Sequence, residues 1–397
     1  MADVSDKMSY LMKDSRRRTA PGPRSALPRL MRRWLVASAS IALFPAAAAA
    51  QEVRSGGNGT IYMGAYNESV YVIDEATLEV TERIPVTSGI PNLMQLSPDN
   101  RTLYVRDAAM EHIEVVDLAE GRSVDSFTLS EGNTRVRIRS MAVDPGGEYV
   151  LLGARSYTKL LDRFEIGEFS ILRVDLDTHE VTDTVPTSVG EQRQGANLMF
   201  SPDGDLLYFF GRDIIAVETE NFTEVDRWEL SQPLEEGLGR MNMSFQRSPY
   251  DDEGIFTNLF RMTDPVQGRQ MMGIARVNLA EQDVDFYTLG PSERVSFALA
   301  PDGRKAYGLR SEIGFYEFWT FDLEGRRVES RVEFPGRPRM SLAPSSNGEL
   351  LYIYNAGNTI DVYDADTHEL LRTVWLDADM TRFLLVPGDA ASNGGGS

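Results

Sequence analysis

A hairpin signature that returns seven times along the chain restricts its fold more than any other feature. In each copy an apolar pair precedes an acidic or amide residue, and a short polar turn and another strand-length run follow. Repeats of about 40–50 residues are typical of β-propeller blades, so the sequence predicts seven blades. The seven anchor residues are Asp74, Asp117, Asp175, Glu218, Asn278, Asp322 and Asp364, spaced 43, 58, 43, 60, 44 and 42 residues apart.

Residues 197–230 show the repeat most clearly. Turn signals divide them into four runs of strand length, at 197–201, 206–211, 213–218 and 224–230. Pro202-Asp203-Gly204 predicts a tight turn, because Pro presets φ and Gly accepts a positive φ. The run 206–210 is apolar at every position, so both faces of its sheet must be buried against other sheets. We therefore expect an all-β fold of seven four-stranded antiparallel blades.

A second set of turns, after the first strand of each blade, supports this count. It contains 97–100, 144–147, 201–204, 248–250, 300–303 and 343–344, each with a Pro. The first blade lacks a first strand at its N-terminal end, where the second strand begins at Thr60. Residues 382–388 after the last blade form an unpaired first strand. We expect the C-terminal strand to join the N-terminal blade and so to close the ring.

The ends of the chain differ in composition from its middle. From Met31, residues 31–50 have a basic start, an apolar core and an Ala-x-Ala pattern before Gln51, which predicts a secretory signal peptide and an exported protein. A membrane-spanning helix is the alternative, and Arg32-Arg33 leaves Sec and twin-arginine export both open. Residues 1–30 are basic and unpatterned, and Met31 is the expected initiator. The propeller spans 51–388, and 389–397 is an expected flexible tail.

Charge and the lack of Cys exclude several classes of function. Residues 51–397 carry 31 Lys and Arg against 57 Asp and Glu, a net charge of −26, which disfavours nucleic acid and anionic lipid as partners. The sequence has no Cys, so it can form no disulfide, no thiolate metal site and no Cys-x-x-Cys-His haem attachment. We expect no cofactor in this chain and no membrane insertion after signal cleavage.

The His and Asp residues do not indicate a catalytic centre. His179 and His368 occupy equivalent turn positions in two blades, which favours a structural role, and His112 has no second His nearby in its blade. A metal site or Ser-His-Asp triad is poorly supported. The recurring anchor carboxylates could be calcium ligands one by one, but their repetition favours acceptors of turn amides.

Arginine recurs where the chain crosses from one blade to the next. All crossings emerge on one face, so these side chains could ring the mouth of the central channel and bind an anion or a partner's carboxylates. The alternative is that they pair with Glu131, Glu191, Glu236 and Glu293 and satisfy local carbonyls. The arginines are Arg137, Arg139, Arg193, Arg240, Arg294, Arg339 and Arg382.

Two long repeat intervals place insertions on the same face. The extra residues fall at 155–167 and around 261–269, between the second and third strands of blades three and five. Phe164 and Phe260 give these segments an apolar character that a partner surface would have, so we expect both to face a partner. The alternative is that the insertions fold back as extra strands.

At these insertions the chain resembles the beta subunit of quinohemoprotein amine dehydrogenases, a seven-bladed propeller of the YVTN type. The resemblance lies in 157–166 leading to 173–175, in 254–260 with its loop to 273–278, and in 295–297 with 305–308. It spans most of residues 59–386. It implies a periplasmic subunit that binds a dihaem cytochrome c subunit and a small subunit bearing cysteine tryptophylquinone. The cofactors would then lie in the partners, and the family supplies no catalytic motif for this chain.

The resemblance thus implies a non-catalytic scaffold that walls a substrate cavity and docks the quinone-bearing and haem-bearing subunits. A stand-alone periplasmic YVTN-type propeller that binds a protein or a small ligand is the alternative. A self-sufficient hydrolase or lactonase would need converging metal ligands or a His base, and the sequence indicates neither.

Overall fold

Strands make up all the regular secondary structure in the part of the chain that the structure describes. That part, taken from a computed structural model, is residues 54–388 without 187–196, 202, 212, 231, 234–238 and 245–246. It lies in one unit, Val53–Ser397. None of these residues belongs to a helix that is long and apolar enough to cross a membrane.

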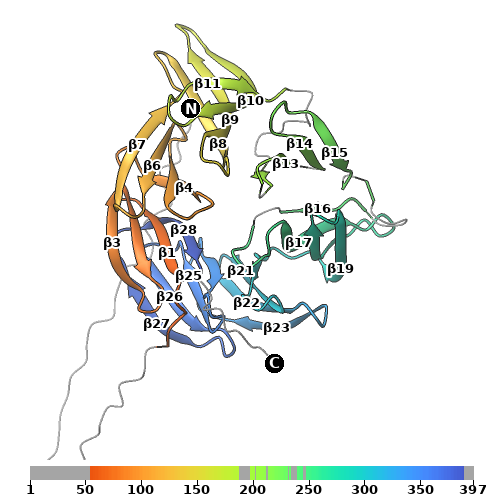
Figure 1. Cartoon of the computed structure of the whole chain (residues 1–397). Coiled ribbons are helices and arrows are strands. Elements are labelled where there is room, and N and C mark those ends of the chain that lie inside the picture. The colour runs from red at the N-terminus through yellow and green to blue at the C-terminus, as the bar shows by residue number, and fades with distance from the viewer. Residues whose placement is uncertain are drawn as a thin grey trace, which may run out of the picture. The chain divides into compact units, whose positions relative to one another are not determined.

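The described strands form seven four-stranded antiparallel sheets, which are the seven predicted blades, and Figure 1 shows them following one another around a common centre. Blade 1 contains β1 (Thr60–Ala65), β2 (Ser69–Asp74), β3 (Glu79–Pro85) and the C-terminal β28 (Met380–Val386). Blade 2 contains β4 (Pro91–Leu96), β5 (Thr102–Asp107), β6 (His112–Asp117) and β7 (Arg122–Thr128). Blade 3 contains β8 (Thr134–Val143), β9 (Tyr149–Lys159), β10 (Phe164–Asp175) and β11 (Val181–Thr184).

The other four blades follow the same order. Blade 4 contains β12 (Asn197–Phe200), β13 (Leu206–Phe210), β14 (Ile214–Glu218) and β15 (Glu224–Trp228). Blade 5 contains β16 (Asn242–Met243), β17 (Ile255–Thr263), β18 (Gln270–Asn278) and β19 (Asp283–Pro291). Blade 6 contains β20 (Ala298–Leu299), β21 (Lys305–Glu312), β22 (Phe315–Asp322) and β23 (Arg327–Glu333). Blade 7 contains β24 (Ser341–Pro344), β25 (Leu350–Tyr354), β26 (Thr359–Asp364) and β27 (Leu370–Trp375).

The predicted repeat agrees with these bounds. All seven anchor residues end the third strand of their blade, and the four runs predicted in 197–230 are β12 to β15. One turn differs. In blade 7, Pro344 is the last residue of β24, and the turn is formed by 345–348, where the Gly348 amide donates to the Ser345 carbonyl at 3.0 Å.

The apolar core lies between the blades. Seven clusters of buried side chains are present among the described residues, and each cluster joins two consecutive blades. The cluster that joins blades 7 and 1 includes Ile61, Tyr71, Tyr352 and Phe383. Each blade is therefore buried on both faces by its neighbours, as the apolar run 206–210 predicts.

The C-terminal strand pairs with the N-terminal blade. β28 runs antiparallel to β1 from Thr60 opposite Val386 to Ala65 opposite Met380, with a bulge beside Gly64. A Cβ at Gly64 would lie 2.6 Å from the Thr381 hydroxyl and 2.9 Å from the Pro91 Cβ, so glycine is required where blade 1 meets blade 2.

The anchor residues hold the turn between the third and fourth strands. Asp175 Oδ1 accepts the Thr178 amide at 2.8 Å, and Asp322 Oδ1 accepts the Gly325 amide at 2.7 Å. Asp74, Asp117, Asn278 and Asp364 accept turn amides in the same way. Glu218 differs, because its longer side chain accepts the side-chain amide of Asn221 at 3.0 Å. The interpretation of the anchors as turn acceptors is confirmed for six blades.

The fourth residue after each anchor has a positive φ and reaches the preceding blade. These seven residues, which we call the latch residues, are Leu78, Gly121, His179, Phe222, Gln282, Arg326 and His368, with φ between 52° and 61°. The left-handed conformation costs a non-glycine residue about 1–2 kcal/mol, so it persists only where the surroundings repay it.

The contacts of the latch residues offset the free energy of this backbone conformation. His179 stacks on Phe127 of blade 2 at 4.6 Å between ring centroids, and its Nε2 lies 2.7 Å from Asp125 Oδ2. His368 stacks on Phe318 of blade 6 at 5.2 Å. These contacts confirm that both histidines are structural. Leu78 and Phe222 are buried in the clusters shared with the preceding blade, Arg326 pairs with Asp285, and Gln282 donates to Asp226.

Removal of β28 tests whether its pairing with β1 holds the ring closed, which stays a prediction. Truncation after Trp375 removes one strand of blade 1 and part of the cluster between blades 7 and 1. Because every blade depends on its neighbours, we expect cooperative loss of structure across the ring, with a melting temperature lower by about 5–10 °C for about 5 kcal/mol of lost burial. An unchanged melting curve would contradict this topology.

Acidification tests the anchor carboxylates. Hydrogen bonds from the Thr178 and Gly325 amides lower the pKa of Asp175 and of Asp322 below the usual value. The unfolded chain therefore binds more protons, so this stabilisation is complete above about pH 4 and is lost as pH falls through the folded-state pKa. In Asp175→Asn with Asp322→Asn, which keep an acceptor oxygen, we expect a smaller decline of stability below about pH 4. Asp283→Asn, an exposed control on β19, should decline as the wild type does.

Candidate functional site

The blade topology divides the connections between two faces. When the first strand of each blade is innermost, the crossings between blades and the hairpins between second and third strands lie at one end, which we call the crossing face. The hairpins between first and second and between third and fourth strands lie at the other end, which we call the turn face. The latch residues are therefore on the turn face, and the arginine-bearing crossings and both insertions are on the crossing face.

Exposed large apolar side chains are unequally distributed between these faces. Among the described residues they occur on the fourth, outer strands and in hairpins of the crossing face, and not in the hairpins of the turn face. Those on the crossing face are Tyr66 in blade 1, Leu161, Phe164 and Ile166 in blade 3, Val266 in blade 5 and Ile313 in blade 6. The crossing face thus offers apolar contacts from four of the seven blades.

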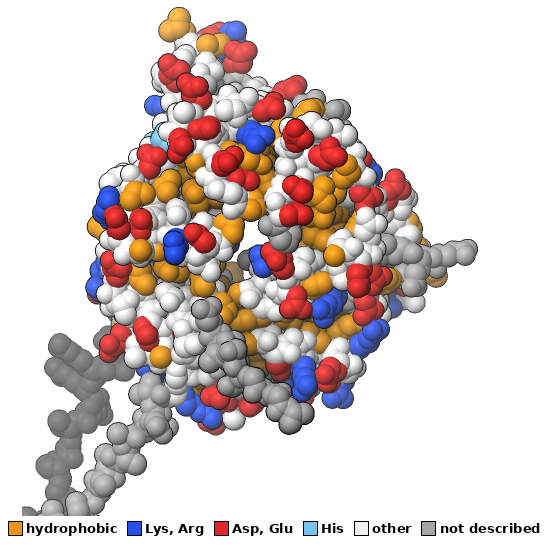
Figure 2. All heavy atoms as spheres, in the orientation of Figure 1, with side chains coloured by type: hydrophobic (Ala, Val, Ile, Leu, Met, Phe, Trp, Pro, Cys, Tyr) orange, Lys and Arg blue, Asp and Glu red, His pale blue; other side chains and the backbone are white. Residues whose placement is uncertain are grey.

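The first insertion extends blade 3 beyond its neighbours. Residues 134–137 of β8 pair with 155–158 of β9, and 164–166 of β10 pair with 157–159, which gives a three-stranded projection. Figure 1 shows the β9–β10 hairpin standing out from the ring, and Figure 2 shows apolar side chains at its end. Leu161 is fully exposed, and Phe164 and Ile166 are 64% and 59% exposed. The insertion therefore lengthens β9 and β10 and does not fold back over blade 3 as an extra strand. It leaves Phe164 exposed, and whether this side chain faces a partner stays a prediction.

The second insertion has a different role. β17 and β18 form a longer hairpin in which Met262 pairs with Met271 and Thr263 with Gln270. Phe260 is 0% exposed and belongs to the cluster between blades 4 and 5. The expectation that Phe260 faces a partner is wrong, because the alternation along β17 directs this side chain into the blade interface and not toward solvent.

The predicted crossing arginines lie where the sequence places them, with one outside the described residues. Arg139, Arg240, Arg294 and Arg339 are exposed, and Arg382 is partly buried on β28. Arg193 falls in 187–196 and is not described. Among the described residues these five arginines form no ion pair. Whether they bind an anion or a partner stays a prediction.

Of the glutamates that the alternative names, Glu131 and Glu293 are described, and neither pairs with a crossing arginine, whereas Arg137 does satisfy a local carbonyl. Glu293 lies 3.2 Å from Arg310 and does not pair with the adjacent Arg294. Arg137 does find a local partner, since it donates to the Ala109 carbonyl at 2.8 Å and lies 3.6 Å from Glu111. Glu191 and Glu236 are outside the described residues.

Arg106 on β5 is a buried cation that the sequence analysis missed. Its Nη1 donates to the carbonyls of Ile138 and Arg139 at 2.9 and 3.0 Å, and its Nη2 donates to Asn92 Oδ1 at 2.7 Å. The side chain is 6% exposed, and its Nε has no hydrogen-bond partner. Burial lowers the pKa of Arg106, the Asp107 carboxylate opposes this, and the positive charges of Arg382 and Arg139 add to the lowering.

This environment places three guanidinium groups near the inner strands of blades 1, 2 and 3. Asn92 and Arg139 occupy bulges of β4 and β8, where the register shifts by one residue. The bulges free the Arg139 carbonyl and the Asn92 side chain to receive Arg106. A charged residue inside the otherwise apolar run 103–106 was the signal that could have revealed this residue.

The described residues show no site for a metal or cofactor. They contain no group of three or more His, Asp or Glu side chains placed to hold a metal ion, and the whole sequence has no Cys. His112, the remaining histidine, has its Nδ1 3.6 Å from Asp107 Oδ2. Its ring lies apart from His179 and His368, which are held at blade interfaces.

No protein-family model matches this sequence, and no curated protein matches it. Among solved structures the chain is similar to Kuenenia stuttgartiensis hydrazine synthase, with 13% identity, 82% of this chain and 94% of that chain covered, and a TM-score of 0.48. It is similar to the dihydro-heme d1 dehydrogenase NirN, with 15% identity, 84% of this chain and 76% of that chain covered, and a TM-score of 0.47. It is also similar to the periplasmic gluconolactonase PpgL of Pseudomonas aeruginosa, with 15% identity, 83% of this chain and 99% of that chain covered, and a TM-score of 0.47. Likenesses this distant carry no information about function.

Substitution of Arg106 tests its role in joining blades 2 and 3. Arg106→Met keeps much of the side-chain volume but leaves the Ile138 and Arg139 carbonyls and the Asn92 side chain without their donor. We expect a loss of about 2–4 kcal/mol in the free energy of unfolding. Arg294→Met, at an exposed crossing, should change it by less than about 0.5 kcal/mol. Equal denaturant midpoints for the two variants would show that the buried hydrogen bonds contribute nothing.

Proposed function

We propose that this protein is an exported propeller that serves as a non-catalytic scaffold subunit of a periplasmic quinohemoprotein amine dehydrogenase-like complex. In this proposal its crossing face walls a cavity and docks a small quinone-bearing subunit and a dihaem cytochrome c subunit. The redox cofactors belong to the partners. The proposed signal peptide, residues 31–50, lies outside the described residues.

The observation that carries the docking role is the exposed apolar end of the β9–β10 projection on the crossing face. Three large apolar side chains exposed side by side on one hairpin are typical of a protein interface. The β9–β10 projection supplies Leu161, Phe164 and Ile166 from one element, in which β9 pairs with both β8 and β10. Because these strands are already ordered, docking on them costs little conformational entropy.

The arginines on the same face complement the exposed apolar side chains of the projection. Arg139, Arg240, Arg294 and Arg339 are exposed and form no ion pair among the described residues, in a chain where acids outnumber bases. Guanidinium groups at the edge of an apolar interface mainly set orientation and association rate. They suit a partner whose docking surface carries carboxylates.

A stand-alone propeller that binds a small ligand is the second candidate. A cavity of about 370 Å³, lined by blade 4 and by the β18–β19 turn of blade 5, favours it. Such a protein would need no partner subunits, so the two candidates differ in what the crossing face binds.

Capture with the full chain distinguishes these candidates. The tagged protein, expressed and exported in a host that also produces the partner subunits, should retain one protein that stains for covalent haem and a smaller one that stains for a quinone. The captured assembly should oxidise an amine, and the chain alone should not, because it lacks the residues for either cofactor. Amine oxidation by the single chain, or capture of neither stained protein, would refute the scaffold role.

Variants of the projection test the docking face. Phe164→Ser with Ile166→Ser removes exposed apolar area, so we expect capture to weaken at least about tenfold at every salt concentration, with thermal stability unchanged. Arg240→Glu with Arg294→Glu should weaken capture mainly at low salt. The matched control on the turn face is Asp203→Lys with Asp302→Lys. If the control pair abolishes capture and the projection pair does not, the wrong face has been assigned.

A further inference from the structure

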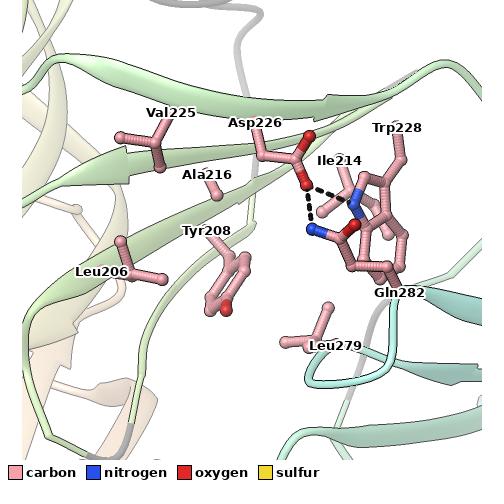
Figure 3. A pocket seen from close by; sticks show the side chains of 9 residues that line it. All are labelled: Leu206, Tyr208, Ile214, Ala216, Val225, Asp226, Trp228, Leu279 and Gln282. Atoms are coloured by element: carbon pink, nitrogen blue, oxygen red, sulfur yellow. Dashed lines mark hydrogen bonds between the residues drawn. The ribbon is translucent and has the colours of Figure 1, made fainter.

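A cavity lies against the surface of blade 4 that faces blade 5. Its volume is about 370 Å³, and β13, β14 and β15 form most of its wall. The turn between β18 and β19 of blade 5 contributes the rest. Figure 3 shows the Tyr208 ring, the Trp228 indole and the Asp226 carboxylate turned into this space. The lining residues are Leu206, Tyr208, Ile214, Ala216, Val225, Asp226, Trp228, Leu279 and Gln282.

One charge stands in this otherwise apolar and aromatic lining. Asp226 is the single carboxylate among the described lining residues, and none of those residues is Lys, Arg or His. The neighbouring Arg227 is directed away, because its guanidinium donates to Glu224 at 2.7 and 2.8 Å. The cavity therefore has a net negative charge beside two aromatic rings.

The Asp226 carboxylate is held in place and keeps room for a further donor. Its Oδ2 accepts the Trp228 indole N–H at 2.8 Å and the Gln282 side-chain amide, and its Oδ1 accepts the Arg227 backbone amide at 2.8 Å. A carboxylate offers about four lone-pair sites, so three donors leave one. Gln282 is an exposed latch residue, and its amide occupies a position that a ligand N–H group could take.

A cation with an apolar body fits this chemistry. Aromatic faces attract cations through the ring quadrupole, and a carboxylate among them adds a direct charge partner. We propose that the cavity binds a small organic ammonium ion, with its charge against Asp226 and its apolar part between Tyr208 and Trp228. The net charge of the chain favours the approach of such a cation. Burial, with the charges of Asp203 and Asp226, raises the pKa of Tyr208, so its hydroxyl stays neutral.

Calorimetric titration of the full chain tests the proposal with matched pairs of compounds. Choline is compared with its uncharged isostere 3,3-dimethyl-1-butanol, and 2-phenylethylammonium with 2-phenylethanol. We expect each ammonium ion to bind at least about tenfold more tightly than its alcohol. The better of the two ammonium ions shows whether the cavity takes a quaternary or a primary amine. Equal affinities within both pairs, or no binding of any compound at about 10 mM, would overturn the proposal.

Variants assign the effect to this cavity. Asp226→Asn keeps an acceptor for Trp228 but removes the charge, so the preference for the ammonium ion should disappear. Gln282→Ala removes a competing donor and should tighten ammonium binding about threefold, which a merely structural role would not produce. Asp283→Asn, an exposed control on β19, should leave both affinities unchanged. A preference that survives Asp226→Asn would place the cation elsewhere.

The cavity proposal does not rest on the scaffold role. Its residues lie on blade 4 and on the turn face of blade 5, whereas the docking proposal uses hairpins of the crossing face. Loss of subunit capture and loss of ammonium binding are separate measurements on separate variants, so either proposal can fail alone.

Discussion

Burial between neighbouring blades is the constraint on which this protein depends. None of the seven apolar clusters belongs to a single sheet, since each combines side chains of two consecutive blades. A lone four-stranded sheet could cover neither of its faces, and the chain has no disulfide to hold it. The two ends of the strand series must therefore meet, and β28 lies beside β1 in the same sheet. The pairing of β28 with β1 thus connects the two ends of the chain within one sheet.

The latch residues show how a local turn contributes to that packing. An anchor side chain fixes the turn, and four residues later the backbone takes a positive φ that, except at Gly121 in blade 2, directs a side chain onto the previous blade. The contact itself varies: leucine or phenylalanine joins a cluster, histidine stacks on phenylalanine, and arginine pairs with aspartate. Blade 5 uses Gln282 instead, a polar latch residue that donates to Asp226 and lines the cavity on blade 4.

The same architecture separates structural and functional surfaces. Turn-face hairpins are short and engaged with neighbouring blades, so their residues are constrained by the ring. Crossing-face hairpins end in solvent, and they tolerate insertions because a longer β9–β10 hairpin extends paired strands without disturbing the clusters. Exposed apolar tips, and arginines such as Arg240 and Arg294 that form no ion pair among the described residues, can therefore accumulate on that face with little loss of stability.

The sequence by itself determined the repeat, the strand order and the two faces. Spacing of the anchors and turns is a local property, because each turn needs its own Asp, Asn, Gly or Pro wherever the blade lies. The resemblance to a family of amine dehydrogenase subunits also came from the sequence, and its implied partners stay a proposal.

Only the tertiary structure decided which side chains face outward and which are shared between blades. The sequence predicts that both Phe164 and Phe260 face a partner, yet one is exposed on a projection and the other is buried between blades 4 and 5. Arg106 is a buried hydrogen-bond donor to blade 3. Asp226 contacts Gln282, which is 56 residues away in the sequence, beside a cavity. Such pairings depend on how one blade seats against the next, and that fit is a property of two surfaces which no local pattern in either strand encodes.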